Sequence, residues 1–276
     1  MFLATTKTIY VQFNKLFLIL GELSQLFLSN CIEKEVKEMK KFNLLLFDLD
    51  DTLLKNSSWF LDGLTRCLAV HPLTNKLNAA KFLDILKQPP RYLIEKLISG
   101  EYSASEFKRA RWEFALRKFD LLIDIERLDE LDNLFYKTSM KCITVNEQIK
   151  SLVKDLGEHF ELGIVTNGLY DPQQKLINMG LGEIFSKEKV FHAEQLGYRK
   201  PDSRIYYKAL DHFDKKTSET LFIGDSWTHD VIAPLEIGME AIWVNLNNVL
   251  PPTLHKPFAV VSDISEIREV LLSKKI

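Results

Sequence analysis

Two groups of aspartates in this sequence each follow a mainly apolar run. Asp48 and Asp50 come after the run 42–47. Asp225 and Asp230 come after a second run late in the chain. In open α/β sheets, ligands bind beyond the carboxyl ends of the strands. Carboxylates buried there destabilise the fold unless a cation or hydrogen bonds compensate them. Mg²⁺ prefers oxygen ligands, so the sequence predicts a magnesium site to which Asp48 and Asp225 contribute. Side chains alternate between the two faces of a strand, so we expect Asp48 and Asp50 on the same face.

Two further polar groups lie between the aspartates. Thr166, Asn167 and Gly168 follow another apolar run, and a hydroxyl with free backbone N–H groups at a strand end forms a cradle for an oxyanion. Pro201 suits the first turn of a helix, so we expect Lys200 just before a helix start. Its ammonium can neutralise a carboxylate or a phosphate there. Each group is common alone, but their joint occurrence in this order is specific.

A parallel sheet is needed to bring these residues to one edge, and the apolar runs predict one. Each run resembles a buried parallel strand, and amphipathic stretches separate the later ones. The predicted strands are 42–47, 161–165, 190–192, 220–223, 241–244 and 259–261. The predicted helices between and after them are 146–156, 172–179, 203–213, 231–237 and 265–272. This alternation predicts an α/β fold with a doubly wound parallel sheet.

The interval between the first two strands is far longer than a single crossover needs. Its sequence predicts mostly helix, interrupted by prolines at positions 72, 89 and 90. We therefore predict a helical domain over residues 55–142. It is inserted into a core domain formed by residues 39–54 and 143–276.

Residues 1–38 differ from the rest of the chain. Lys15 and Glu22 interrupt their apolar clusters, so neither cluster reaches the ~20 residues of a membrane span. Apolar residues at helical spacing indicate an amphipathic helix. Extra sequence upstream of a natural start at Met39 is the competing interpretation. We assign this extension no function.

Composition narrows the classes of partner. The 276 residues are 46% hydrophobic and 27% charged, as in a globular protein, and the net charge is −2. No basic field recruits nucleic acid or an anionic membrane. Three widely spaced cysteines without a C-x-x-C pair predict reduced thiols in a cytoplasmic protein. We expect a small-molecule partner, no nucleic acid and no membrane span; the oligomeric state stays open.

At the two groups of aspartates and the polar groups between them, the sequence resembles the haloacid dehalogenase (HAD) superfamily. The four HAD motifs match Asp48-Leu49-Asp50, Thr166, Lys200, and Gly224-Asp225 with Asp230. The helical insert matches the family's cap, of the C1 type, and the resemblance covers residues 42–272. It implies a Rossmann-like core carrying an inserted helical cap domain. The residues in and around these motifs are similar to those of the branch that contains pyrimidine 5′-nucleotidases and N-acylneuraminate-9-phosphatases.

The resemblance also implies roles for single residues. Asp48 would be the nucleophile that forms an aspartyl-phosphate, and Asp50 the acid and base for the two successive steps. Mg²⁺ would be held by Asp48, Asp225 and the backbone carbonyl of Asp50, with Asp230 helping directly or through water. The transferring oxygens would be bound by Thr166, the Asn167 N–H and Lys200.

The expected activity is hydrolysis of a small phosphomonoester, first of all a nucleoside 5′-monophosphate. A sugar phosphate or an acylneuraminate phosphate is the alternative substrate. A receiver-like phosphoacceptor signalling domain is the alternative from another class, but such domains need no long helical insert and carry their acidic pair in a different order. Asp50 separates phosphatases from the dehalogenases of the superfamily, which lack an acid–base aspartate there. In the insert, Arg91, Arg109, Arg111 and Trp112 are read as surface charges and a core tryptophan.

Overall fold

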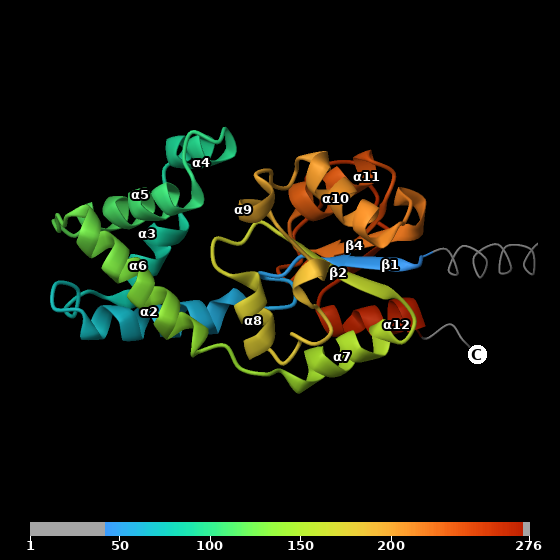
Figure 1. The fold of residues 1–276 in the computed structure, drawn as a ribbon, viewed down its shortest axis with the longest axis horizontal. Helices are drawn as coiled ribbons and strands as arrows, with labels where there is room; N and C mark the ends of the chain where they lie inside the picture. The colour runs from blue at the N-terminus through green and yellow to red at the C-terminus, as the bar shows by residue number, and fades with distance from the viewer. Residues whose placement is uncertain (1–41, 273–276) are drawn as a thin grey trace, which may run out of the picture. The chain divides into compact units, whose positions relative to one another are not determined.

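The computed structural model describes residues 42–272, with the exception of the side chains of residues 56–58. Its centre is a sheet of six strands in the order β3-β2-β1-β4-β5-β6, and every pair of neighbours is parallel. Figure 1 shows β1, β2 and β4 between α10 and α11 on one side and α7 and α12 on the other. The strands are β1 (Leu44–Phe47), β2 (Glu161–Thr166), β3 (Val190–His192), β4 (Thr220–Gly224), β5 (Glu240–Val244) and β6 (Ala259–Val261). The predicted α/β fold with a parallel sheet is confirmed. The predicted extension over residues 1–38 lies outside the described residues.

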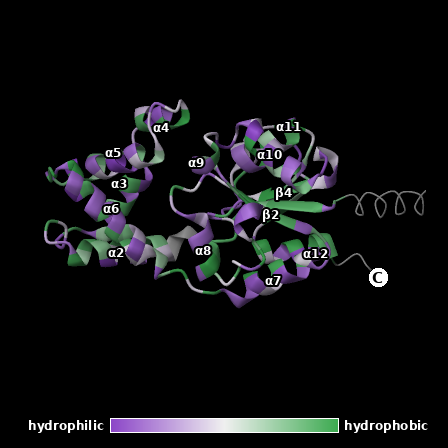
Figure 2. Cartoon of the chain, in the orientation of Figure 1, coloured by the Kyte–Doolittle hydropathy of each residue, from purple (hydrophilic) through white to green (hydrophobic). Residues whose placement is uncertain are grey.

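Helices cover both faces of the sheet because β1 is apolar on both sides. Leu45 and Phe47 belong to one hydrophobic cluster, and Leu44 and Leu46 belong to another. The first cluster includes residues of α7 (Glu147–Gly157), α8 (Pro172–Asn178) and α12 (Ile267–Leu272). The second includes residues of α10 (Ser203–Phe213) and α11 (Ala233–Glu236). Figure 2 shows the corresponding colours, with the strands largely hydrophobic and the helices banded.

Five helices occupy the interval between β1 and β2. They are α2 (Asn56–Val70), α3 (Ala79–Lys87), α4 (Arg91–Ile98), α5 (Ala104–Arg117) and α6 (Ile125–Met140). The side chains of Asn78, Ser103 and Asp124 accept N–H groups at the starts of α3, α5 and α6, as N-caps do. Trp112 and Phe135 are fully buried in the same cluster that contains β1 residues. The division into core and cap domains at residues 55 and 142 stays a prediction.

Short helical segments complete the chain. They are α9 (Ala193–Leu196), the 3₁₀ turns Lys187–Lys189, Thr217–Glu219 and Ile264–Glu266, and the π-helix Trp227–Ile232. No helix between residues 42 and 272 is long and apolar enough to cross a membrane.

One predicted helix start is wrong. The helix expected over 231–237 begins at Trp227 as a π-helix and continues as α11. Pro234 has no N–H to donate to the carbonyl four residues back, so regular α-helical bonding is interrupted at this point. The helix predicted over 203–213 is confirmed as α10, but Pro201, which was expected in a first helical turn, lies outside it. The Asp202 side chain accepts the N–H of Arg204 at 3.0 Å, which makes Asp202 the N-cap and places Pro201 before the helix.

Candidate active site

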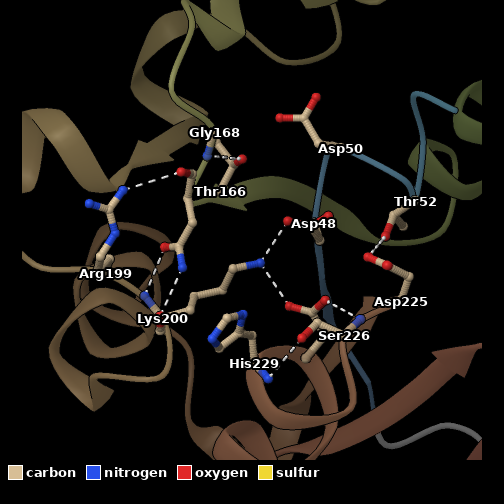
Figure 3. Close-up of polar contacts among 12 residues, drawn as sticks. Asp48, Asp50, Thr52, Thr166, Gly168, Arg199, Lys200, Asp225, Ser226 and His229 are labelled. Carbon is tan, nitrogen blue, oxygen red and sulfur yellow. Dashed lines mark hydrogen bonds and ion pairs between the residues drawn. The ribbon is translucent and has the colours of Figure 1, made fainter. Parts of the chain in front are cut away.

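The predicted site residues lie at the carboxyl ends of the three central strands. Asp48 directly follows β1, Thr166 ends β2, and Asp225 directly follows β4. Phe47 of β1 pairs with Ile164 of β2 and Ile223 of β4, so these strand ends are level. The strand order reverses direction at β1, and this switch point is where open α/β sheets bind ligands. The fold therefore brings together residues that the sequence spreads over most of its length (Figure 3).

Three carboxylates form an acidic cluster here. One oxygen each of Asp48, Asp225 and Asp230 lies within 4.8 Å of the other two. Asp48 and Asp230 are buried, and Asp225 is half-buried. Asp230 also accepts the Ser226 N–H at 2.9 Å. A Cβ at position 224 would lie 2.4 Å from the carboxyl carbon of Asp230, so only glycine leaves room for this carboxylate beside β4.

Lys200 is the cation of this cluster. Its Nζ lies 2.7 Å from Asp48 Oδ1 and 2.7 Å from Asp230 Oδ1, and the residue is buried. The Asn167 side chain holds the Lys200 backbone by two hydrogen bonds, accepting its N–H at 2.9 Å and donating to its carbonyl at 2.8 Å. From the sequence, only the backbone N–H of Asn167 was expected to contribute to the site. Its amide side chain is thus a positioning group that sequence reasoning missed.

The charges in the cluster do not balance. Burial raises the pKa of Asp48 to about 8, and the negative charges of Asp230 and Asp225 add to this effect while Lys200 opposes it. Burial, with the charge of Asp230, also raises the pKa of Asp225 to about 6. Burial opposes the ammonium form of Lys200, but Asp230 and Asp48 outweigh it and raise the pKa of Lys200.

The donor set fits a divalent cation. Three carboxylates and one ammonium leave two negative charges, which a divalent ion balances. All the side-chain donors are oxygens, the ligands that Mg²⁺ prefers. The fold therefore brings together three of the residues predicted as metal ligands, Asp48, Asp225 and Asp230.

Asp50 lies apart from that cluster. Its carboxylate points away from Asp48 (Figure 3), and both of its oxygens lie 2.7 Å from the Nζ of Lys175 in α8. Strand alternation does not relate Asp48 to Asp50, because β1 ends at Phe47 and Asp50 stands in the following turn. The predicted metal role of Asp50 concerns its backbone carbonyl and not this carboxylate. Lys175 carried no signal in the sequence, where a lysine in an amphipathic helix reads as exposed.

The turn after β1 ties the two strand ends together. Asp51 has a φ of 66°, a left-handed conformation that Asp tolerates better than most residues. Its N–H donates to the Leu54 carbonyl at 2.8 Å. The Thr52 hydroxyl donates to Asp225 Oδ1 at 3.4 Å, which links this turn to the end of β4.

The end of β2 forms the remaining side of the site. Thr166 is buried, and its hydroxyl oxygen accepts the Gly168 N–H at 3.1 Å. A ring nitrogen of His192 lies 2.7 Å from the Gly168 carbonyl oxygen. His229 is half-buried, and burial lowers its pKa. The loop 166–168 is thereby fixed next to both Asp50 and Lys200.

A cavity of about 590 Å³ lies beside this loop. Its lining combines residues of α5 and α6, residues that follow β2, and residues in and after β3. Lys108, Asp132, Tyr136, Leu169, Tyr170, His192 and Glu194 are among them. Asp132 accepts hydrogen bonds from the Trp112 indole at 2.9 Å and the Tyr170 hydroxyl at 2.7 Å. These bonds join α5 and α6 to the segment that follows β2.

Three arginines of the insert, Arg91, Arg109 and Arg111, contact side chains of the protein itself. Arg91 pairs with Glu95 and Arg109 with Asp129, which agrees with the prediction of surface charges. The prediction is wrong for Arg111, which is buried and whose Nη2 donates to the Tyr170 hydroxyl at 3.4 Å.

Comparisons with known proteins agree with the resemblance of the sequence to the HAD superfamily. The sequence profile of the haloacid dehalogenase-like hydrolases matches residues 42–238. The HAD-hydrolase YfnB of Bacillus subtilis is 28% identical over 213 residues, covering 75% of this chain and 86% of that protein. N-acylneuraminate-9-phosphatase of Rattus norvegicus is 22% identical, covering 85% and 96%. Pyrimidine 5′-nucleotidase YjjG of Escherichia coli is 23% identical, covering 84% and 98%.

A solved structure agrees with the fold. The crystal structure of YfnB bound to magnesium superposes with a TM-score of 0.69 at 23% identity, covering 84% of this chain and 99% of that one. The profile match spans most of the chain and contains the first strand, the polar turn after β2, Lys200 and the acidic group after β4. With this fold and these matches, the chain belongs to the haloacid dehalogenase-like hydrolase family and is an enzyme, a hydrolase with phosphatases among its relatives.

Proposed function

We propose that this protein is a Mg²⁺-dependent phosphatase that hydrolyses a small phosphomonoester through an aspartyl-phosphate on Asp48. One observation carries the proposal. The Asp48 carboxylate lies in a cluster of three carboxylates, held by Lys200, at the switch point of the sheet. A carboxylate in such a place can act as a covalent nucleophile toward a phosphoryl group.

In the first step, the Asp48 carboxylate attacks phosphorus. The transferring oxygens are bound by the Lys200 ammonium, the Thr166 hydroxyl and the Asn167 N–H, as the family's motifs imply. The carboxyl of Asp50 gives its proton to the leaving oxygen. Phosphoryl transfer depends mainly on positioning and charge stabilisation, and the Asn167–Lys200 hydrogen bonds supply the positioning here.

In the second step, the aspartyl-phosphate is hydrolysed. The Asp50 carboxylate takes a proton from the attacking water, and the acyl–phosphate bond breaks to restore Asp48. One residue serves as acid and then as base because the two steps are sequential.

Asp48, Asp225 and the backbone carbonyl of Asp50 would hold Mg²⁺, with Asp230 helping directly or through water. Bound there, the ion would neutralise charge on the phosphoryl oxygens. HAD-like relatives provide one parallel, since the YfnB crystal structure is described as bound to magnesium. The uncompensated negative charge around Asp48 is the support that this chain itself offers.

Two observations favour a phosphatase over a dehalogenase and over a receiver-like signalling domain. Asp50 occupies the acid–base position that the superfamily's dehalogenases lack. A receiver-like signalling domain is disfavoured by the helices α2–α6 between β1 and β2 and by the acidic group that follows Lys200.

A nucleoside 5′-monophosphate is the substrate we favour. The cavity beside the loop 166–168 is lined by Tyr136 and Tyr170, whose rings are nearly parallel with centroids 6.0 Å apart. Aromatic faces stack on any base. Lys108 adds a cation to the lining. YjjG is named a pyrimidine 5′-nucleotidase, and the rat relative supports an acylneuraminate phosphate as the alternative. We place the reaction in the cytoplasm.

A panel of phosphomonoesters tests the proposal. Purified full-length protein with Mg²⁺ is given nucleoside monophosphates, sugar phosphates and an acylneuraminate 9-phosphate, and free phosphate is measured. The wild type should release phosphate, fastest from a nucleotide, and Asp48→Asn should lose the activity. Asp214→Asn is the matched control, since Asp214 is exposed and has a φ of 50° that Asn also tolerates. Absence of phosphate release from every substrate, or full activity in Asp48→Asn, would contradict the proposal.

A further inference from the structure

Lys175 is a buried lysine outside the residues assigned above. Only 2% of its side chain is exposed, and its Nζ lies 2.7 Å from both oxygens of Asp50. A buried ammonium is costly unless it is paired. This charge has thus been placed against one specific carboxylate, the one that the proposed function uses for proton transfer.

Residues from several elements surround the Lys175–Asp50 pair and hold it in place. The Lys175 Nζ lies over the Trp59 ring of α2, 5.2 Å from its centroid. A Cβ at position 168 would be 2.7 Å from Asp50 Oδ2 and 3.4 Å from the Lys175 Nζ. The glycine therefore leaves the space that this pair fills. The Asp50 side chain is 19% exposed, so part of it stays open toward the solvent side.

We propose that Lys175 is a positioning residue that acts through Asp50, holding its carboxyl group in the place where it exchanges a proton with the leaving oxygen and then with water. The inference rests on the proposed function. In the first step, the O–H bond of Asp50 breaks and the leaving oxygen gains the proton as its bond to phosphorus breaks. Asp50 is then a carboxylate, whose charge the neighbouring ammonium compensates. In the second step, that carboxylate takes a proton from water, and Lys175 keeps its own protons throughout.

A purely structural role for Lys175 makes a different prediction. A lysine that only stabilises the fold would affect every substrate alike. A lysine that positions Asp50 affects the first step only where the leaving group needs a proton, whereas the second step is the same for every substrate. Nucleoside monophosphates release an alkoxide-like oxygen and need that proton, whereas p-nitrophenyl phosphate releases a stable phenolate and hardly needs it. The ratio of the two rates therefore separates the roles.

The experiment compares kcat/KM for these two substrates in the full-length protein with Mg²⁺, because kcat/KM reports the first step and not the common second step. Lys175→Met should lower kcat/KM on the nucleotide by roughly 100-fold, the lower range for loss of a general acid, and lower kcat/KM on p-nitrophenyl phosphate far less. Asp50→Asn should show the same selectivity in the first step, and Lys175→Arg, which keeps a cation, should recover part of the nucleotide rate. Lys215→Met is the matched control, since Lys215 pairs with Glu161 at the other end of β2, and it should leave both rates unchanged.

The double variant Lys175→Met/Asp50→Asn gives a second measurement. If Lys175 acts through Asp50, removing the lysine from Asp50→Asn should cost the nucleotide reaction little more. Equal losses on both substrates in Lys175→Met, or multiplied losses in the double variant, would overturn the proposal while leaving the phosphatase function intact. Lys175→Gln replaces Lys175→Met if circular dichroism shows that the latter does not fold. A wild type that hydrolyses neither substrate refutes the proposed function, and this inference with it.

Discussion

The amide side chain of Asn167 forms two hydrogen bonds with the backbone of Lys200, at 2.8 Å and 2.9 Å. These bonds fix the lysine that contacts both Asp48 and Asp230. We predict that Asn167→Ala lowers kcat/KM by roughly 100-fold, because a displacement of about 1 Å at a reacting group costs that much. Asn167→Asp keeps only the acceptor and should lose less than the alanine variant. Steady-state kinetics checks this, and equal activity of wild type and Asn167→Ala would contradict it.

Gly224 should be essential for the acidic cluster. In Gly224→Ala, the new Cβ would lie 2.4 Å from the Asp230 carboxyl carbon, so Asp230 or the end of β4 must move. We expect a loss of stability of about 1–3 kcal/mol, typical of overpacking, together with weaker Mg²⁺ binding. Urea unfolding and calorimetric titration with Mg²⁺ measure the two effects. Gly197→Ala serves as a control for alanine in place of glycine, because nothing lies within 4 Å of its Cβ, although its φ of 76° adds local strain. Unchanged Mg²⁺ affinity in Gly224→Ala would contradict the account.

The substrate proposal predicts a role for Tyr136. Tyr136→Ala should raise KM for a nucleoside monophosphate by roughly 10-fold, since one base–aromatic stack is worth about 1–3 kcal/mol. Hydrolysis of a small phosphate ester without a base should be unaffected. An unchanged KM for every nucleotide tested would favour the sugar-phosphate alternative.

Metal-free protein should become less stable as the pH rises. Burial raises the pKa of Asp48 from 3.8 to about 8, so the folded state holds a proton that the unfolded state has lost. The contribution of Asp48 to stability therefore falls between about pH 4 and about pH 8 and is constant above that range. Mg²⁺ favours the ionised carboxylate and should reverse the trend.

Thermal unfolding with EDTA at several pH values checks this prediction. The comparison is with Asp48→Asn, which cannot titrate at this position. The difference in Tm between the two proteins should change with pH in EDTA and shift in favour of the wild type when Mg²⁺ is added. A difference that is independent of both pH and Mg²⁺ would refute the charge argument.

The fold and the acidic cluster were predictable for a physical reason. A strand buried on both faces must be continuously apolar, and the polar residue that follows such a run stands at the sheet edge. Thus Asp48 after β1 and Asp225 after β4 were identified from local sequence alone. The π-helix before Pro234 was missed, and Pro201 was assigned to a helical turn, because several residues in each segment can begin a helix.

Pairings between distant residues could not be read from the sequence. Lys175 and Asp50 are 125 residues apart, and Lys175 occurs in a short helix where lysine is normally exposed. The same holds for Asn167, whose side chain contacts a backbone 33 residues later. Such contacts depend on how the loops after β1 and β2 pack, which only the folded chain determines.

The nucleophilic role of Asp48 is the central claim, and trapping the covalent intermediate tests it most directly. Asp50→Asn lacks the base for hydrolysis, while p-nitrophenyl phosphate needs little acid to form the intermediate. Acid quenching of this variant during turnover, followed by peptide mass spectrometry, should find one phosphoryl group on Asp48. A phosphoryl group on another residue, or phosphate release by the wild type with Asp48→Asn fully active, would contradict the account.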